Sequence, residues 1–98
     1  MSVEYITIKT YSVHYNIDPS FIILLEDAGL IELTIINGEK SVHTEQFVML
    51  ERYAHLHYDL NINIEGIDAI QHLVQKVISM QEEINTLKNQ LNFHTIKE

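Results

Sequence analysis

The sequence contains no cysteine, so it can form neither disulfide bonds nor thiolate metal sites, and it has no thiol nucleophile. It also contains no apolar run approaching the roughly 20 residues that are needed to span a bilayer. Residues 1–4 lack the basic and apolar regions of a secretion signal. These absences predict a cytoplasmic protein with no membrane association.

Basic residues are scarce. Six Lys and Arg stand against fourteen Asp and Glu, which gives a net charge of −8. Such a charge repels polyphosphate, and a single arginine provides little bidentate recognition of guanine or phosphate. The cations are spread along the whole chain, at Lys9, Lys40, Arg52, Lys76, Lys88 and Lys97. The charge therefore argues against nucleic acid and favours a basic partner.

The first half of the chain predicts a helix-turn-helix. Residues 3–8 alternate in polarity like a short strand, and a helix follows through about residue 15. Asn16 tolerates the left-handed conformation that ends a helix. Asp18 is a good N-cap, so a second helix is expected from Pro19 to Ala28, ending before Gly29.

Asn37-Gly38 predicts a β-hairpin, because this dipeptide favours the tight turn between β-prone segments. The flanking strands are expected at 31–36 and 39–42. Thr44 is predicted to cap a third helix that runs to about Asp59. Its expected core face consists of Phe47, Leu50, Tyr53, Ala54 and Leu60.

Asn63 is predicted to cap a fourth helix that continues to about Asn92, a length of roughly 43 Å. A 3-4 apolar spacing continues over three heptads of this helix, which is the pattern of a coiled-coil seam. It consists of Ile70, Leu73, Val77, Met80, Ile84, Leu87 and Leu91. We expect the seam to pair with a second copy, in antiparallel orientation, although the chain's own domain or a partner could also cover it. Three further apolar residues, Ile67, Val74 and Ile78, are expected to pack against the helix-turn-helix.

Two other patterns have alternative interpretations. In the apolar run 21–25, Ile22 and Leu25 are core by spacing, whereas Phe21 and Leu24 could be core or a contact patch; core is favoured.

The histidines give no metal site. His55 and His57 lie about 200° apart on a helix, and we expect the others, lacking an acidic partner at ligand spacing, to lie at the surface or at an edge: His14, His43, His72 and His94. No phosphate loop or paired-carboxylate motif is present, so we expect no enzyme and no cofactor.

Three segments carry a resemblance to known proteins. The order of elements, and residues 17–31 in particular, resemble the MerR-like DNA-binding domain. Closer still is the chaperone-modulator (CbpM-like) family, whose Leu-x-x-acidic-Leu-x-apolar-Asp/Asn-x-x-Gly-Ile string is matched throughout by residues 56–67. The resemblance extends over most of the chain, because it also includes His14 with the helix stop at 29–32, and the tail 85–93.

The resemblance implies a non-catalytic regulator that binds the J-domain of a DnaJ-like co-chaperone and blocks its action with Hsp70. J-domains present a basic helix, which an acidic surface could occupy. The candidate contacts are Glu26, Asp27, Glu51, Asp59, Glu65 and Asp68. The alternative is a MerR-like DNA-binding regulator or a partner-binding adaptor on the same scaffold. DNA binding is disfavoured, because residues 1–50 hold two lysines against seven acids.

We therefore predict a mostly α fold, a MerR-like winged helix-turn-helix with a small β-hairpin wing and a long C-terminal coiled-coil helix. Residues 1–62 are expected to form the degenerate winged helix-turn-helix with the third helix. Residues 63–98 are expected to form the dimerisation helix, packed with the first part as one domain.

Overall fold

The computed structural model describes the backbone of residues 4–97 and the side chains of residues 4–92. Val3, in the predicted first strand, and the side chains of Phe93 and His94 lie outside the described residues. The chain divides after Asp68 into an N-terminal unit and a C-terminal unit, each compact. Each unit is described by itself.

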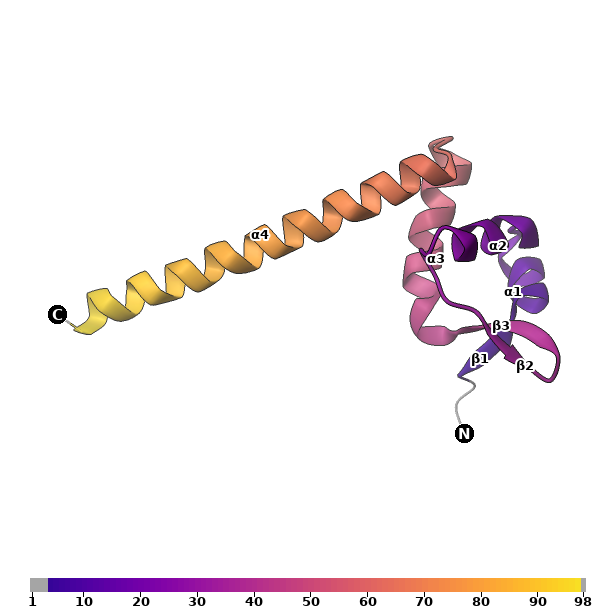
Figure 1. Cartoon of the computed structure of the whole chain (residues 1–98), viewed down its shortest axis with the longest axis horizontal. Coiled ribbons are helices and arrows are strands. Elements are labelled where there is room, and N and C mark those ends of the chain that lie inside the picture. Colours follow the sequence, from indigo (N-terminus) through magenta and orange to yellow (C-terminus); the bar gives the residue numbers. More distant parts are fainter. Residues whose placement is uncertain (1–3, 98) are drawn as a thin grey trace. The chain divides into compact units, whose positions relative to one another are not determined.

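The helix-turn-helix is formed as predicted. Strand β1 (Tyr5–Thr7) leads into helix α1 (Ile8–Tyr15), and α2 (Pro19–Asp27) follows after a short turn (Figure 1). Asn16 ends α1 with φ of 55°, in the left-handed region. The Asp18 side chain accepts a hydrogen bond from the Ser20 N–H at 2.9 Å, which caps α2. The first strand is shorter than predicted, because Ile8 already belongs to α1.

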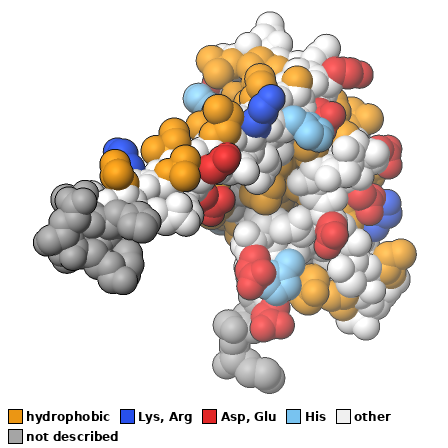
Figure 2. Space-filling view, turned by 60° about the vertical axis from the view of Figure 1, so that its left-hand side comes forward, with side chains coloured by type: hydrophobic (Ala, Val, Ile, Leu, Met, Phe, Trp, Pro, Cys, Tyr) orange, Lys and Arg blue, Asp and Glu red, His pale blue; other side chains and the backbone are white. Residues whose placement is uncertain are grey.

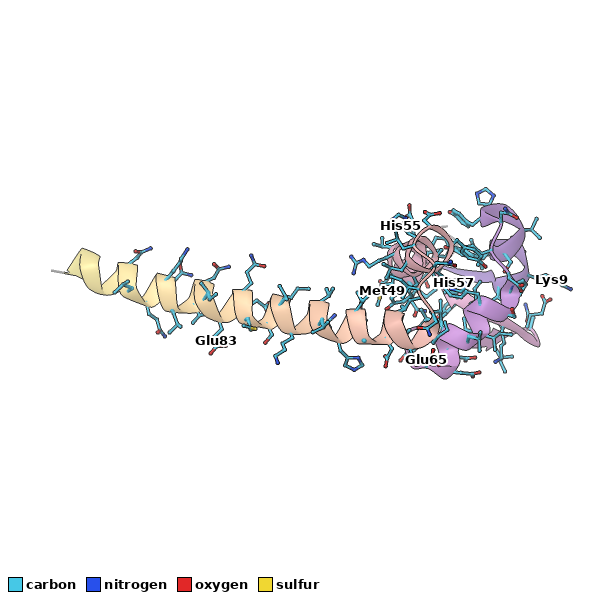
Figure 3. The ribbon with its side chains drawn as sticks, turned by 90° about the horizontal axis from the view of Figure 1, so that it is seen from above. Lys9, Met49, His55, His57, Glu65 and Glu83 are labelled. Atoms are coloured by element: carbon cyan, nitrogen blue, oxygen red, sulfur yellow. The ribbon has the colours of Figure 1, made fainter. Side chains whose placement is uncertain are left out.

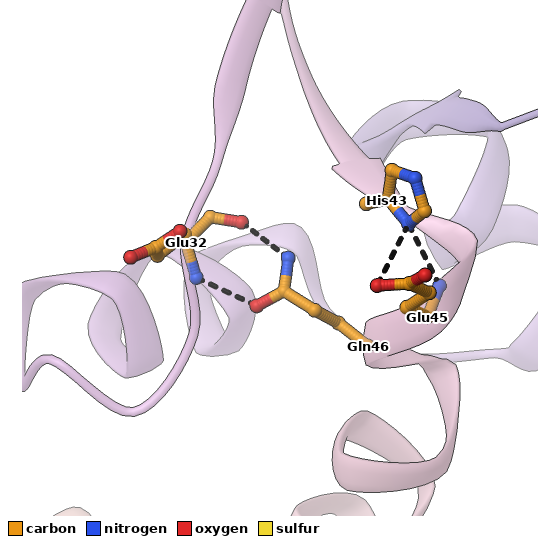
Figure 4. Close-up of polar contacts among 4 residues, drawn as sticks. All are labelled: Glu32, His43, Glu45 and Gln46. Carbon is orange, nitrogen blue, oxygen red and sulfur yellow. Dashed lines mark hydrogen bonds and ion pairs between the residues drawn. The ribbon is translucent and has the colours of Figure 1, made fainter.

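The wing is a hairpin of β2 (Thr34–Ile36) and β3 (Glu39–His43), with left-handed φ at both turn residues, 52° at Asn37 and 81° at Gly38. Strand β3 lies between β1 and β2 in an antiparallel sheet. The prediction that this hairpin begins at residue 31 was wrong. The Gln46 side chain hydrogen bonds to both the N–H and the carbonyl of Glu32, at 2.8 and 2.7 Å, where a strand partner would otherwise stand (Figure 4).

The third helix differs from the prediction at both ends. It starts as a 3-10 turn, η1 (Thr44–Gln46), continues as α3 (Phe47–Ala54) and ends as a π-helical turn, η2 (His55–Asp59). Thr44 is not the cap: the Nδ1 of His43 accepts the hydrogen bond from the Glu45 N–H at 3.0 Å (Figure 4). Because a π turn holds more residues than an α turn, it rotates the next residues about the helix axis, and Leu60 is 55% exposed instead of core.

The core of the N-terminal unit draws on every helix. Phe21 is 3% exposed and Leu24 is 49% exposed, so Phe21 is core, whereas Leu24 lies at the surface. Ile67, in the first turns of α4, is fully buried, as predicted. The largest fully buried side chains are Tyr11, Tyr53, Ile22, Leu25, Leu50, Ile67 and Val42.

Helix α4 (Ile64–Lys97) has 34 residues, about 51 Å at 1.5 Å each, and runs five residues past the predicted end. The Oδ1 of Asn63 accepts the Gly66 N–H at 2.8 Å and so caps it, as predicted. A Cβ at Gly66 would meet Ile62 Cγ2 at 2.6 Å and Asn63 Oδ1 at 3.1 Å, which explains the glycine there. In the described residues no helix is long and apolar enough to cross a membrane.

The C-terminal unit exposes its apolar seam. Ile70 and Val74 are half-buried and Ile78 is 46% exposed, so Ile78 is not a core residue. Six of the seven seam residues are between 51 and 66% exposed in the single chain: Leu73, Val77, Met80, Ile84, Leu87 and Leu91.

Candidate functional site

The net charge belongs entirely to the N-terminal unit. Up to Asp68 the chain has eleven acidic and three basic residues, whereas from Ala69 onward it has three of each. On the face seen in Figure 2 the acidic side chains are scattered over the surface and do not form one patch. The N-terminal unit is therefore the part of the chain that would attract a basic partner.

The six predicted contact residues lie in three places. Glu26 and Asp27 end α2, Glu51 lies on α3 and Asp59 in η2, while Glu65 and Asp68 lie in the first turns of α4 (Figure 3 labels Glu65). The structure brings Glu51 and Asp59 together on the wall of one pocket. The other predicted residues do not line that pocket.

The face that would read DNA carries little free positive charge. Lys40 is the single cation of the wing, and its Nζ lies 2.8 Å from Glu26 Oε1, at the end of α2. The hydrogen bond from Lys40 to Glu26 raises the pKa of Lys40, with further contributions from the charges of Glu26 and Asp27. The exposed side chains of α2 include Ile23 and Leu24, and α2 contains no Lys or Arg.

The π-helical turn η2 contacts the helix-turn-helix through the side chains of His57 and Tyr58. The His57 ring stacks on Phe21, with centroids 4.5 Å apart and 15° between the ring planes. Its Nδ1 lies 3.0 Å from the carbonyl oxygen of Ile62, so Nδ1 carries a proton and donates it. The Tyr58 hydroxyl accepts a hydrogen bond from the Asp18 N–H at 3.1 Å, just ahead of α2. Turns of this kind are frequent at functional sites.

Two histidines have acidic neighbours that the sequence did not reveal. His55 Nδ1 lies 2.7 Å from Asp59 Oδ2, because residues four apart lie on the same face of a helix (Figure 3 labels His55 and His57). His43 Nδ1 lies 4.0 Å from Glu45 Oε2 (Figure 4), an acidic neighbour that was not predicted. Because that nitrogen accepts the Glu45 N–H, it is unprotonated and the contact is not an ion pair. The described residues contain no group of three or more side chains arranged to hold a metal ion.

A pocket of about 420 Å³ opens between α1, the turn after it, α3 and η2. Its walls include Tyr11, Tyr15 and Tyr58 as well as Glu51 and Asp59. Burial, followed by the charges of Tyr15 and Glu51, raises the pKa of Tyr11 to about 12, so its hydroxyl stays protonated. This pocket was not predicted from the sequence. The spacing of Tyr11 and Tyr15, four residues apart, was the available signal, because it places both rings on one helix face.

A family model described as MerR HTH family regulatory protein matches residues 6–89. The match covers the helix-turn-helix, the wing, the third helix and most of α4. No curated protein and no solved structure matches the chain.

Proposed function

The chain belongs to the MerR HTH family of regulatory proteins, and we propose that it is a non-catalytic modulator, similar to the CbpM-like family, that binds the J-domain of a DnaJ- or CbpA-like co-chaperone. One observation carries the proposal: the wing cation Lys40 is paired with Glu26 on α2, the helix that reads DNA in this architecture. A family scaffold whose DNA-reading face lacks free cations is suited to a protein partner.

The charge supports a basic partner. A net charge of −8 confined to the N-terminal unit attracts a basic helix and speeds association, and salt screens this attraction. J-domains present such a helix to Hsp70. Binding here would mask that helix, and the co-chaperone would no longer stimulate the Hsp70 ATPase or deliver substrate.

The segment that resembles the chaperone modulators has a local structural role that is consistent with the proposal. Residues 56–67 contain η2, the Asn63 cap and Gly66, where a side chain would collide with Ile62. The same segment presents Asp59 and Glu65 at the surface, both predicted as partner contacts.

We also propose that the protein forms a homodimer through α4. Six seam residues are more than half exposed in the single chain, and an apolar stripe of this length would promote aggregation if nothing covered it. A second copy carries the same stripe and covers it by self-complementary packing.

The proposal is tested by isothermal titration of the purified protein with isolated J-domains from the same cell, at about 50 and 300 mM salt. We expect micromolar or tighter binding that weakens at the higher salt concentration. Absence of heat with every J-domain would overturn the proposal. In that case DNA binding, for which the intact helix-turn-helix and wing are the supporting observation, is tested by titration with duplex DNA.

A further inference from the structure

We propose that the pocket between α1, α3 and η2 binds one cationic side chain, an arginine or lysine, of the protein partner. This inference deepens the proposed function and rests on it, because it names the part of the J-domain surface that the acidic unit holds. All residues of the pocket belong to the N-terminal unit. A volume of about 420 Å³ lies within the range of roughly 300–1,000 Å³ that is usual for ligand sites.

The wall of the pocket carries two carboxylates and no Lys or Arg. Glu51 projects from α3 and is exposed, so it can pair with a guanidinium or an ammonium group that enters. Asp59 lies 2.7 Å from His55 Nδ1, which fixes the position of its carboxylate, and its other oxygen can accept a second hydrogen bond. An anionic ligand would meet two like charges here, which disfavours phosphate and carboxylate ligands.

Three tyrosine rings complete the wall. Tyr11 and Tyr15 pack with their centroids 4.4 Å apart and their planes tilted by 33°. Tyr15 and Tyr58 are 50 and 48% exposed, so a cation that enters the pocket can approach their rings. Aromatic faces attract ammonium and guanidinium groups, more strongly where the contact excludes water. Rings together with carboxylates select a cation over a neutral group of the same size.

Tyr11 adds a polar group to the same wall. The residue as a whole is only 2% exposed, and it lines the pocket. Among the described residues the one buried side-chain polar atom without a hydrogen-bond partner is Ser12 Oγ, so the Tyr11 hydroxyl is not an unsatisfied buried group. Its oxygen can accept a hydrogen bond from a guanidinium or ammonium N–H that enters the pocket.

The experiment uses the whole 98-residue chain and two probes whose termini are blocked. One is N-acetyl-arginine amide, and the other is its uncharged isostere N-acetyl-citrulline amide. Tyrosine side-chain NMR signals are followed during titration. We expect the arginine probe to shift the signals of Tyr11, Tyr15 and Tyr58, and the citrulline probe to bind at least about tenfold more weakly. Equal shifts with both probes, or no shift of these signals, would overturn the inference.

Variants then connect the pocket to the partner. Glu51→Gln, which removes one charge from the wall, should weaken both the arginine probe and the J-domain by about tenfold. Glu83→Gln, on α4 and outside the pocket (Figure 3), makes the same charge change and should leave both unchanged. Tyr15→Phe should keep the affinity, because the ring remains, whereas Tyr15→Leu should lower it several-fold. Circular dichroism checks that each variant is folded.

The two proposals fail in distinguishable ways. If the J-domain binds and Glu51→Gln leaves its affinity unchanged, the pocket inference is wrong and the modulator role stands. If no J-domain binds but the arginine probe shifts the pocket tyrosines, the pocket recognises a cation from another partner and the modulator role is wrong.

Discussion

The two units of the chain use apolar and charged residues in opposite ways. The N-terminal unit buries its large apolar side chains, among them Leu25 and Leu50, and carries the whole net charge of −8 at its surface. The C-terminal unit has no net charge, and its apolar residues lie at the surface: Leu87 is 59% exposed and Leu91 is 66% exposed. The first unit is thus a folded body with a charged surface, and the second is a helix whose apolar stripe lacks a core of its own. The proposals accordingly assign recognition of a partner to the first unit and self-association to the second.

The largest effect should come from exchanging leucine for alanine in each unit. Leu25→Ala creates a cavity in the core and should lower the free energy of unfolding by about 2–5 kcal/mol. Leu87→Ala removes an exposed side chain, so its effect should appear only through association and should vanish on dilution. Chemical denaturation at several protein concentrations measures both. A concentration-independent loss in Leu87→Ala would contradict the division of roles.

A charge in the seam should break the proposed dimer and leave the N-terminal unit folded. Ile84→Lys places an ammonium group in the apolar stripe and should weaken self-association by more than about 100-fold, roughly 3 kcal/mol. Sedimentation equilibrium measures the change. Gln81→Lys, on the polar side of α4, is the matched control and should leave the dimer intact. If both variants remain dimeric, the seam is not the interface.

Replacing acidic residues by lysine should weaken partner binding when the residues lie in the N-terminal unit, and not when they lie in the C-terminal unit. Glu65→Lys combined with Asp68→Lys should weaken J-domain binding more than tenfold, about 1.4 kcal/mol, if the start of α4 contributes to the interface. Glu82→Lys combined with Glu83→Lys gives the same change of charge in the C-terminal unit and should have little effect. Titration calorimetry distinguishes the two pairs. Unchanged affinity in a folded Glu65/Asp68 variant would exclude this surface.

The smallest effect concerns the start of α4. Asn63→Ala removes the acceptor for the Gly66 N–H and should cost about 1 kcal/mol, seen as a loss of helical circular dichroism on mild heating. Asn63→Asp keeps an acceptor and should behave like the natural protein. Equal losses in both variants would show that the hydrogen bond does not hold the start of α4.

The sequence predicted the features that depend on near neighbours. Caps at Asp18 and Asn63, the left-handed Asn16 and the Asn37-Gly38 turn were all correct, because each depends on the conformational preference of one or two residues. The π turn at 55–59 was missed, since its apolar spacing is also compatible with a regular α-helix. His43 was not recognised as a cap, because histidine rarely has that role.

The sequence indicated parts of the candidate pocket but not the pocket itself. Glu51 and Asp59 were predicted as partner contacts, but Tyr11 and Tyr15 come from a helix some forty residues earlier, and only the tertiary packing brings them to the same wall. The Glu26–Lys40 pair likewise joins α2 to the wing across the fold. Such contacts depend on how the elements pack, which no local pattern in one sequence specifies.

The Gln46 side chain has a consequence for how the hairpin ends. The pairing of β2 with β3 stops at Thr34 and Ser41, and continued pairing would place Glu32 opposite His43. The Gln46 amide instead occupies both the N–H and the carbonyl of Glu32, so these two backbone groups have partners beyond the last pair of the hairpin. The Glu32 amide proton should therefore exchange slowly with deuterium although it lies outside every strand, and Gln46→Ala should make it exchange fast.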